Sequence, residues 1–472
     1  MNRTVVLDVV GLTREFLDAR MPRLAKWATN RNISRITPVL PAVTCTSQAT
    51  FYTGELPHKH GIVANGWYFR DDCEVHFWRQ SNRLVQAPKL WEVARRYDPN
   101  FTFANLFGWF NMYSTADISI TPRPMYPADG RKIPDVYTEP PALRTEIQQK
   151  LGTFPLFDFW GPRASIRSTR WIAESAKYVE ERFRPTLTFV YLPHLDYNLQ
   201  RLGPDDPAIA TDLGTVDNLV GDLIDFYEAH DARVIVLSEY GVVPVKKPVH
   251  LNRVLREAGL LRVRDEMGLE QLDAGASAAF AVADHQVAHV YVNDASKLDQ
   301  VRRLLEQTAG VDVVLDDAGK QRLGIDHGRA GEFVVVAQSE AWFTYYYWLD
   351  DARAPDFART VDIHRKPGYD PAELFVDPAI KLPMLKLGSK LIARKLGFRN
   401  LFDIIPLDAS LIKGSHGRTD KPDFRSPVFI GNGSNEKIDA TEVSAEILSS
   451  LGVGVRRFEM KTESDLDRES TE

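Results

Sequence analysis

Hydroxyl side chains crowd one short stretch of the chain, residues 38–67, which reads PVLPAVTCTSQATFYTGELPHKHGIVANGW. Its first threonine, Thr44, is followed by the turn dipeptide Thr53-Gly54 and, farther on, by Asn65-Gly66. A hydroxyl in the first turn of a helix can attack phosphorus, because the free N–H groups at that helix end stabilise the negative charge of a phosphate. The simpler interpretation is that Thr44 only caps a helix and Asn65 only forms a turn.

Carboxylate, amide and imidazole side chains stand at or just after the predicted strands. In parallel α/β sheets the carboxyl ends of the strands meet at one edge, so we expect these groups to converge there. Oxygen and nitrogen donors brought together from several segments are typical of a metal site, although a strand-end aspartate often only caps the next helix. The candidates are Asp8, Asp196, Gln200, Glu239, Tyr240 and His416.

The elements that position these residues alternate between strands and helices. This order predicts a mostly parallel sheet covered by helices, an α/β fold. A compact set of short predicted helices and strands at 246–345 predicts a small α+β insertion, which divides the core into 1–245 and 346–460. The polar end, 461–472, is expected to be disordered. The predicted strands are 4–10, 186–192 and 232–241, and the predicted helices are 170–183 and 212–230.

Composition narrows the class of protein. The 472 residues carry a net charge of −6, which argues against a nucleic-acid polymer or a membrane surface as partner. No apolar run reaches the length of a transmembrane helix, and the N-terminus does not resemble a signal peptide. The two cysteines, Cys45 and Cys73, form no disulfide framework. We therefore expect a cytoplasmic protein, and the oligomeric state is left open.

Taken in order, these motifs resemble the alkaline phosphatase superfamily, and most of all its nucleotide pyrophosphatase/phosphodiesterase branch. The resemblance rests on Asp8, the block around Thr44, the segment PHKHGIVAN at 57–65, Asp196 and the SHG around His416. It implies an alkaline-phosphatase-like core with Thr44 as the nucleophile, which also touches a metal. It further implies that Asn65 holds a phosphoryl oxygen, and that Asp8, Asp196 and His416 are metal ligands.

The chain departs from this family pattern at three positions. Glu239 and Tyr240 stand where the family has Asp-His, and Gln200 stands where it has His. Glu239 and Gln200 can still offer oxygen to a cation, whereas neutral Tyr240 is a poor ligand and is assigned to substrate binding. The resemblance implies two divalent cations, with zinc as first choice. The oxygen-rich set leaves manganese, magnesium or calcium open.

The predicted activity is metal-dependent hydrolysis of a phosphodiester, pyrophosphate or phosphomonoester bond in a small molecule, possibly a nucleotide. The alternatives are a phosphonate hydrolase or phosphomutase on the same scaffold, and a binding protein that has lost its second metal. Arg365 and Lys366 suit a phosphate or carboxylate of the substrate, or else belong to a solvated loop. The remaining histidines, His285, His289 and His364, have no assigned role.

Overall fold

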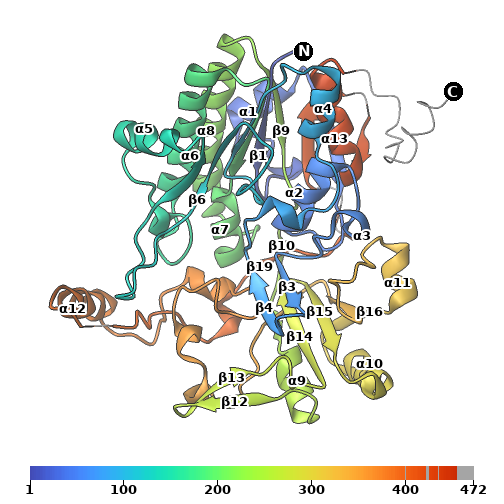
Figure 1. The fold of residues 1–472 in the computed structure, drawn as a ribbon, viewed down its shortest axis with the longest axis vertical. Helices are drawn as coiled ribbons and strands as arrows, with labels where there is room; N and C mark the ends of the chain where they lie inside the picture. Colours follow the sequence, from blue (N-terminus) through green and yellow to red (C-terminus); the bar gives the residue numbers. More distant parts are fainter. Residues whose placement is uncertain (399, 421, 423–424, 434, 454–472) are drawn as a thin grey trace.

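The computed structural model describes residues 1–453 except 399, 421, 423–424 and 434, so the predicted tail 461–472 lies outside the described residues. A nine-stranded sheet forms the upper half of the molecule (Figure 1). Its strands are β1 (Thr4–Val9), β2 (Asn32–Thr37), β5 (Phe103–Leu106), β6 (Ile118–Pro122), β7 (Val136–Glu139), β8 (Leu187–Leu192), β9 (Arg233–Leu237), β20 (Val428–Gly431) and β21 (Lys437–Asp439). They lie in the order β21-β2-β20-β9-β1-β8-β5-β6-β7.

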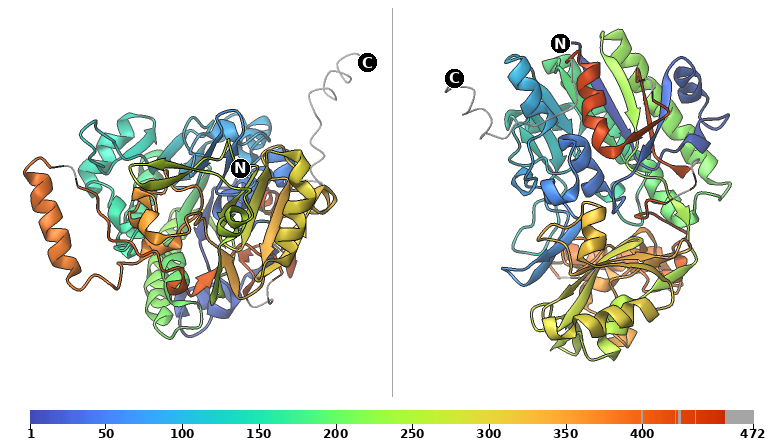
Figure 2. Two further views of the ribbon diagram at one scale, coloured as in Figure 1. Left: turned by 90° about the horizontal axis from the view of Figure 1, so that it is seen from below. Right: turned by 90° about the vertical axis from the view of Figure 1, so that its right-hand side faces the viewer.

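The centre of this sheet, from β9 to β6, is parallel, whereas β20 and β7 pair antiparallel with their neighbours. Two layers of helices cover its faces, which is why β1 and β8 are mostly apolar and fully buried (Figures 1 and 2). One layer contains α1 (Pro22–Ala28), α5 (Ala142–Leu151), α6 (Ile166–Phe183) and α8 (Ile209–Ala229). The other contains α2 (Thr44–Thr53), α4 (Leu90–Tyr97) and α13 (Val443–Ser450). The predicted α/β fold is therefore confirmed.

A second sheet forms the lower half of the molecule (Figure 1). Its antiparallel strands lie in the order β14 (Ala279–Asp284), β15 (Val287–Val292), β17 (Phe333–Ala337) and β16 (Val311–Leu315). Around it lie α9 (Leu251–Glu257), α10 (Leu298–Gln307), α11 (Asp317–Arg322) and the hairpin of β12 (Val263–Glu266) and β13 (Leu269–Leu272). All of these elements fall within 246–345.

The hydrophobic core of this lower half extends beyond 246–345. It includes Tyr68 and Phe77 from the hairpin of β3 (Gly66–Phe69) and β4 (Glu74–Phe77), and it includes Phe357, Leu407 and Ile412 from the chain that follows. These side chains are buried because the second sheet offers them an apolar face. Sequence pattern marks a residue as apolar but does not show which sheet covers it.

The helix α2 explains the crowding of hydroxyls. Every residue of α2 is buried, so its polar side chains need partners inside the protein. Thr50 and Thr53 donate to the carbonyls one turn earlier, of Thr46 (2.9 Å) and Ala49 (2.7 Å). Gly54 ends the helix with φ of 70°, in the left-handed region that glycine adopts without strain. Hydroxyls thus allow a polar sequence to form a buried helix.

The remaining short elements join the two halves or lie at their edges. They are α3 (Pro57–His60), α7 (His194–Leu202), the pair β10 (Val243–Pro244) and β19 (Gly414–Ser415), the pair β11 (Lys247–Val249) and β18 (Ala341–Phe343), and α12 (Pro383–Lys395). The helix α12 stands apart from the body of the molecule in Figure 1 and in the left view of Figure 2. Among the residues described, no helix is both long and apolar enough to cross a membrane.

Candidate active site

Strand register brings the first group of candidate residues together. Asp8 lies in β1, directly opposite Tyr191 of β8 and Leu237 of β9. The chain leaves β8 into α7, which carries Asp196 in its first turn, and it leaves β9 into Glu239. Because the three parallel strands end at the same edge, the three carboxylates meet there as predicted from the strand pattern.

Thr44 is the first residue of α2 and is 4% exposed. Its Oγ1 lies 3.3 Å from the hydroxyl of Tyr240. The next backbone N–H, that of Cys45, donates to Oδ1 of Asn65 (2.9 Å). Asn65 is itself held by Asp284, which accepts from the Asn65 backbone N–H (2.8 Å) and from its Nδ2 (3.1 Å). The structure therefore places Asn65 beside the helix end that carries Thr44.

Gln48 lies between two buried carboxylates, one turn after Thr44. Its Nε2 donates to Oε1 of Glu239 (2.6 Å) and approaches Oδ2 of Asp8 (3.3 Å). The second oxygens, Asp8 Oδ1 and Glu239 Oε2, are buried and have no hydrogen-bond partner among the described residues. Sequence reasoning missed Gln48, although its spacing of four residues places it on the same face of the helix as Thr44.

The electrostatics of this pair fit a cation. Burial, and then repulsion from Glu239, raises the pKa of Asp8 well above its usual value. Burial raises the pKa of Glu239 to about 7. Two desolvated carboxylates with unpartnered oxygens, beside the hydroxyl of Thr44, form an oxygen set that suits a divalent cation.

The second group of predicted ligands surrounds Asp196. Gln200, one turn later on α7, donates from Nε2 to Asp196 Oδ2 (2.6 Å), while its Oε1 accepts from Tyr369 (2.9 Å). Tyr240 donates to Asp196 Oδ1 (3.4 Å), and Nε2 of His416 lies 4.0 Å from the same oxygen. Burial raises the pKa of Asp196 to about 7. Because these groups bond to one another, this cluster suits a cation less well than the Asp8–Glu239 pair.

No three His, Cys, Asp or Glu side chains within the described part of the chain form a ready metal cluster. A cation at the Asp8–Glu239 pair would therefore draw on other oxygens as well, such as that of Thr44. This agrees with the oxygen-rich ligand set expected from Glu239 and Gln200.

Four aromatic rings stack across the middle of the site. The rings of Tyr240 and His416 lie 3.6 Å apart and almost parallel, at 8°. His285 follows at 3.7 Å from His416, and Tyr369 at 3.6 Å from His285. The Nδ1 of His416 donates to the carbonyl of Ala42 (2.8 Å), which fixes the tautomer and turns Nε2 toward the site. Tyr369 therefore belongs to the site, and sequence reasoning missed it.

Arg365 and Lys366 are not brought to this site. Arg365 is exposed and pairs with Asp356 (3.0 Å). Lys366 is 1% exposed and pairs with two carboxylates, Asp370 (2.7 Å) and Glu373 (2.8 Å). A buried lysine between two carboxylates has a structural function, and neither residue lines the cavity described below.

The two other histidines without an assigned role lie in different surroundings. His289 is buried in β15, donates from Nε2 to the carbonyl of Val63 (3.0 Å) and accepts at Nδ1 from the N–H of Gly331 (3.1 Å). Both of its nitrogens are used in packing the two halves together. His364 lines the cavity, and its side chain is exposed.

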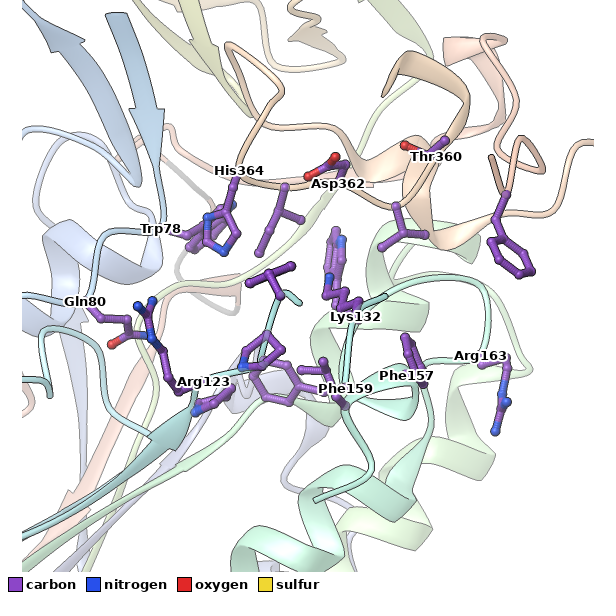
Figure 3. Close-up of a pocket in the computed structure, with 18 of the residues that line it drawn as sticks. Trp78, Gln80, Arg123, Lys132, Phe157, Phe159, Arg163, Thr360, Asp362 and His364 are labelled. Carbon is purple, nitrogen blue, oxygen red and sulfur yellow. The ribbon is translucent and has the colours of Figure 1, made fainter. Parts of the chain in front are cut away.

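A cavity of about 1680 Å³ opens above Thr44. Its deep end is polar and includes Asn65 and Asp196, and its middle is aromatic, with the rings of Trp78 and Trp109 4.8 Å apart. Aromatic and basic side chains face its outer part (Figure 3). Among those labelled there are Trp78, Arg123, Lys132, Phe157, Phe159 and His364. The tyrosines at 345–347, by contrast, are buried in the second core.

Comparison with known proteins identifies a family for this chain. The model of the type I phosphodiesterase / nucleotide pyrophosphatase family matches residues 4–370. An uncharacterized pyrophosphatase/phosphodiesterase of Schizosaccharomyces pombe is 22% identical over 250 residues, and the match covers 52% of this chain but only 45% of that protein.

Two solved structures share the fold. Murine ectonucleotide pyrophosphatase / phosphodiesterase 5, in an inactive form with AMP, is 14% identical with a TM-score of 0.59, and the match covers 99% of both chains. Phosphonoacetate hydrolase of Sinorhizobium meliloti, with phosphonoformate, is 15% identical with a TM-score of 0.59, over 95% of this chain and 96% of that one. The family match extends over most of the chain, and the chain therefore belongs to the type I phosphodiesterase / nucleotide pyrophosphatase family.

Proposed function

We propose that this protein hydrolyses a phosphodiester or pyrophosphate bond of a small molecule, with Thr44 as the nucleophile. The observation that carries the proposal is the position of Thr44. Its hydroxyl is at the N-terminus of a buried helix, at the deep end of the cavity and beside a pair of unsatisfied carboxylates. A helix N-terminus attracts a phosphate, and the neighbouring groups can lower the barrier to loss of the hydroxyl proton.

In the proposed reaction the Oγ1 of Thr44 forms a bond to phosphorus, and the bond from phosphorus to the leaving oxygen breaks. The leaving group takes up a proton, and the enzyme retains a phosphothreonine ester. Water then attacks the same phosphorus, the bond to Oγ1 breaks, and Thr44 recovers its proton. Both displacements need the phosphoryl oxygens to be held in place.

Two side chains are positioned to hold these oxygens. Asn65 is fixed by Asp284 and the N–H of Cys45, so its amide is oriented before the substrate arrives. The hydroxyl of Tyr240 lies between Thr44 and Asp196, and burial together with the Asp196 and Glu239 charges raises its pKa strongly. Tyr240 therefore stays protonated and serves as a hydrogen-bond donor.

Asp8, Glu239 and Thr44 are the residues that would hold a divalent cation. When bound, such an ion would favour the alkoxide of Thr44 and offset the charge of the phosphate. For the second predicted ion, Asp196, Gln200 and His416 remain the candidate ligands, and the hydrogen bond between Gln200 and Asp196 favours weaker binding.

The proposed substrate is a small phosphate ester, in keeping with the AMP held by one structural neighbour, whereas the phosphonoformate held by the other is a phosphonate. A nucleotide and a phosphonate are thus both candidates for the first substrate panel. The cytoplasmic location stays a prediction, based on two cysteines that are free in the fold.

The decisive experiment compares the variants Thr44→Ala and Thr53→Ala. Both remove a threonine hydroxyl from α2, but Thr53 is at the far end of the helix, where it bonds to a backbone carbonyl. With an aryl phosphodiester and added manganese or zinc, Thr44→Ala should lose more than about 99% of kcat, at least 2.7 kcal/mol of barrier. Thr53→Ala should keep its activity. Acid quenching of the unmodified enzyme should trap phosphate on the peptide that contains Thr44. A Thr44→Ala variant that keeps more than about a tenth of kcat contradicts the assignment.

A further inference from the structure

The helix α12 exposes its apolar side to solvent. Seven of the eighteen large apolar side chains that are exposed among the described residues lie between 382 and 401. Leu385 is 68% exposed, Ile392 62% and Leu396 71%. They recur at intervals of seven and four residues, so they share one side of the helix. A patch of this kind on a folded protein marks an interaction surface.

The polar side of α12 is turned the other way. The Nζ of Lys386 donates to Asp403 (3.1 Å), and Lys390 also contacts Asp403 (2.5 Å). These contacts tie the helix to the chain segment that returns from it. Lysines therefore anchor α12 to the protein, while Leu385 and Ile392 are left uncovered.

The charge of this segment differs from that of the whole chain. Residues 381–403 contain six Lys or Arg and one Asp, a local charge of +5, whereas the whole protein carries −6. A basic segment with one apolar side matches the surface of an anionic bilayer, where the apolar side enters the headgroup region and the cations attract lipid phosphates. The net charge of the whole chain argued against a membrane partner, but it does not show this local excess of positive charge at 381–403.

The cavity leads from Thr44 to this helix. Leu387 and Leu391 of α12 line its outer end, together with Phe398, Leu401 and other apolar residues of the same segment. The opposite wall carries Phe157 and Phe159 (Figure 3). The volume of about 1680 Å³ exceeds the range of about 300–1,000 Å³ typical of small-ligand pockets. The polar end is deep and the apolar end opens beside α12.

We propose that α12 docks on an anionic membrane surface, and that the cavity takes from it a phosphate ester with one long apolar chain. The phosphate would lie at Thr44, and the chain would extend along the aromatic wall toward α12. This inference rests on the proposed function for the identity of the reacting bond. The docking of α12 does not depend on it.

The first test measures binding of the full-length protein to sedimented vesicles. One set of vesicles is phosphatidylcholine, and the other is equal parts phosphatidylcholine and phosphatidylglycerol. The double variant Leu385→Gln/Ile392→Gln removes apolar surface without changing charge. Its control, Met267→Gln/Leu349→Gln, does the same at two exposed sites outside α12. We expect binding to the anionic vesicles only, at least about tenfold weaker in the α12 variant and unchanged in the control.

Three results would overturn membrane docking. The unmodified protein could fail to bind anionic vesicles, or the α12 variant could bind as well as the control. Sedimentation analysis could instead show a dimer that the α12 variant breaks, in which case this face joins two copies of the chain.

The second test concerns the ligand and needs no catalysis. Hexadecyl phosphate, kept below its aggregation limit, should bind at least about tenfold more tightly than methyl phosphate in calorimetry, because its chain buries apolar surface. The variant Leu391→Gln should reduce this preference, and Leu349→Gln should not. Equal affinity for the two phosphates refutes the apolar-chain site.

Turnover separates this inference from the proposed function. Aryl phosphodiesters that carry a methyl, octyl or hexadecyl group should be hydrolysed with kcat/KM rising with chain length. Hydrolysis that is independent of chain length contradicts the lipid-like substrate and supports the Thr44 hydrolase. If none of the esters is hydrolysed, the proposed function fails, whereas vesicle and hexadecyl phosphate binding still decide the further inference.

Discussion

Replacing Glu239 by Gln should stabilise the protein when metal is removed and destabilise it, relative to the unmodified protein, when metal is present. Glu239 and Asp8 face each other in a buried site, where both charges are desolvated and the charge of Glu239 raises the pKa of Asp8 further. The change Glu239→Gln removes one charge, and its amide oxygen can still accept from Gln48, which now contacts Glu239 at 2.6 Å.

The magnitude follows from the pKa of Glu239, which rises from 4.5 to about 7 on burial. A raised pKa means that the folded protein binds the proton more tightly than the unfolded chain does. The favourable contribution is therefore present at low pH and is lost as the pH rises from about 4.5 through 7. Near pH 8 in chelator the charge of Glu239 thus opposes folding by about 3 kcal/mol, and Glu239→Gln should recover a large part of this.

A bound cation reverses the order of stability. An ion present at a thousand times its dissociation constant stabilises the folded state by about 4 kcal/mol, and it needs both carboxylates. Urea unfolding should be measured at about pH 8 for both proteins, with EDTA and then with zinc or manganese. The control Glu270→Gln removes a buried carboxylate that Arg256 neutralises (2.8 Å), so it should be destabilising to the same extent in both conditions. If Glu239→Gln is the less stable protein in EDTA and added metal stabilises neither, the cation site is refuted.

The other predictions concern four positions in the site and the packed core. Tyr240→Phe keeps the ring stacked on His416 but removes the hydroxyl near Thr44, so kcat should fall on the order of a hundredfold. An unchanged kcat would show that the Tyr240 hydroxyl has no part in catalysis. The double change Glu239→Asp/Tyr240→His should raise the zinc content per chain in elemental analysis, because imidazole is a better zinc ligand than a phenol. It should lower turnover, because the phenol that donates a hydrogen bond is lost. Unaltered zinc content would speak against a second metal site. Lys366→Met should lower the free energy of unfolding, measured in urea, by about 3–5 kcal/mol, because it leaves two buried carboxylates unpaired. A raised KM at unchanged stability would instead support the prediction that Lys366 binds the substrate. Burial lowers the pKa of His60 to about 3, so as the pH falls the unfolded chain takes up a proton at this imidazole before the folded protein does. The free energy of unfolding should therefore fall by about 2 kcal/mol as the pH falls to about 5. His60→Gln should lose this part of the pH dependence, and a variant with the same slope as the unmodified protein would contradict the burial of a neutral imidazole.

Local patterns in the sequence were sufficient for the core of the fold. The apolar runs that became β1, β8 and β9 lie at 4–10, 186–192 and 232–241, and the helices between them lie close to the predicted ranges. This succeeds because a strand buried on both faces is nearly continuous in apolar residues, and an amphipathic helix repeats its apolar residues with the helical period. The strand order then brings Asp8, Asp196 and Glu239 to one edge, where the site was expected.

The partners of these residues were decided only by the tertiary structure. Nothing near Lys366 in the sequence shows that it is buried between two carboxylates and not turned toward a phosphate. Likewise Gln48 reaches Glu239 across 191 positions, and Asp284 fixes Asn65 across 219.

The exposure of the apolar side of α12 was also decided only by the tertiary structure. No helix is predicted from the sequence at 383–395, and an apolar periodicity would by itself predict a face packed on a core. Periodicity is a local property of the helix, set by its own backbone. What covers a face, or leaves it open, depends on where the rest of the chain lies. In this fold the lysines of α12 contact the returning chain, while Leu385 and Ile392 face solvent.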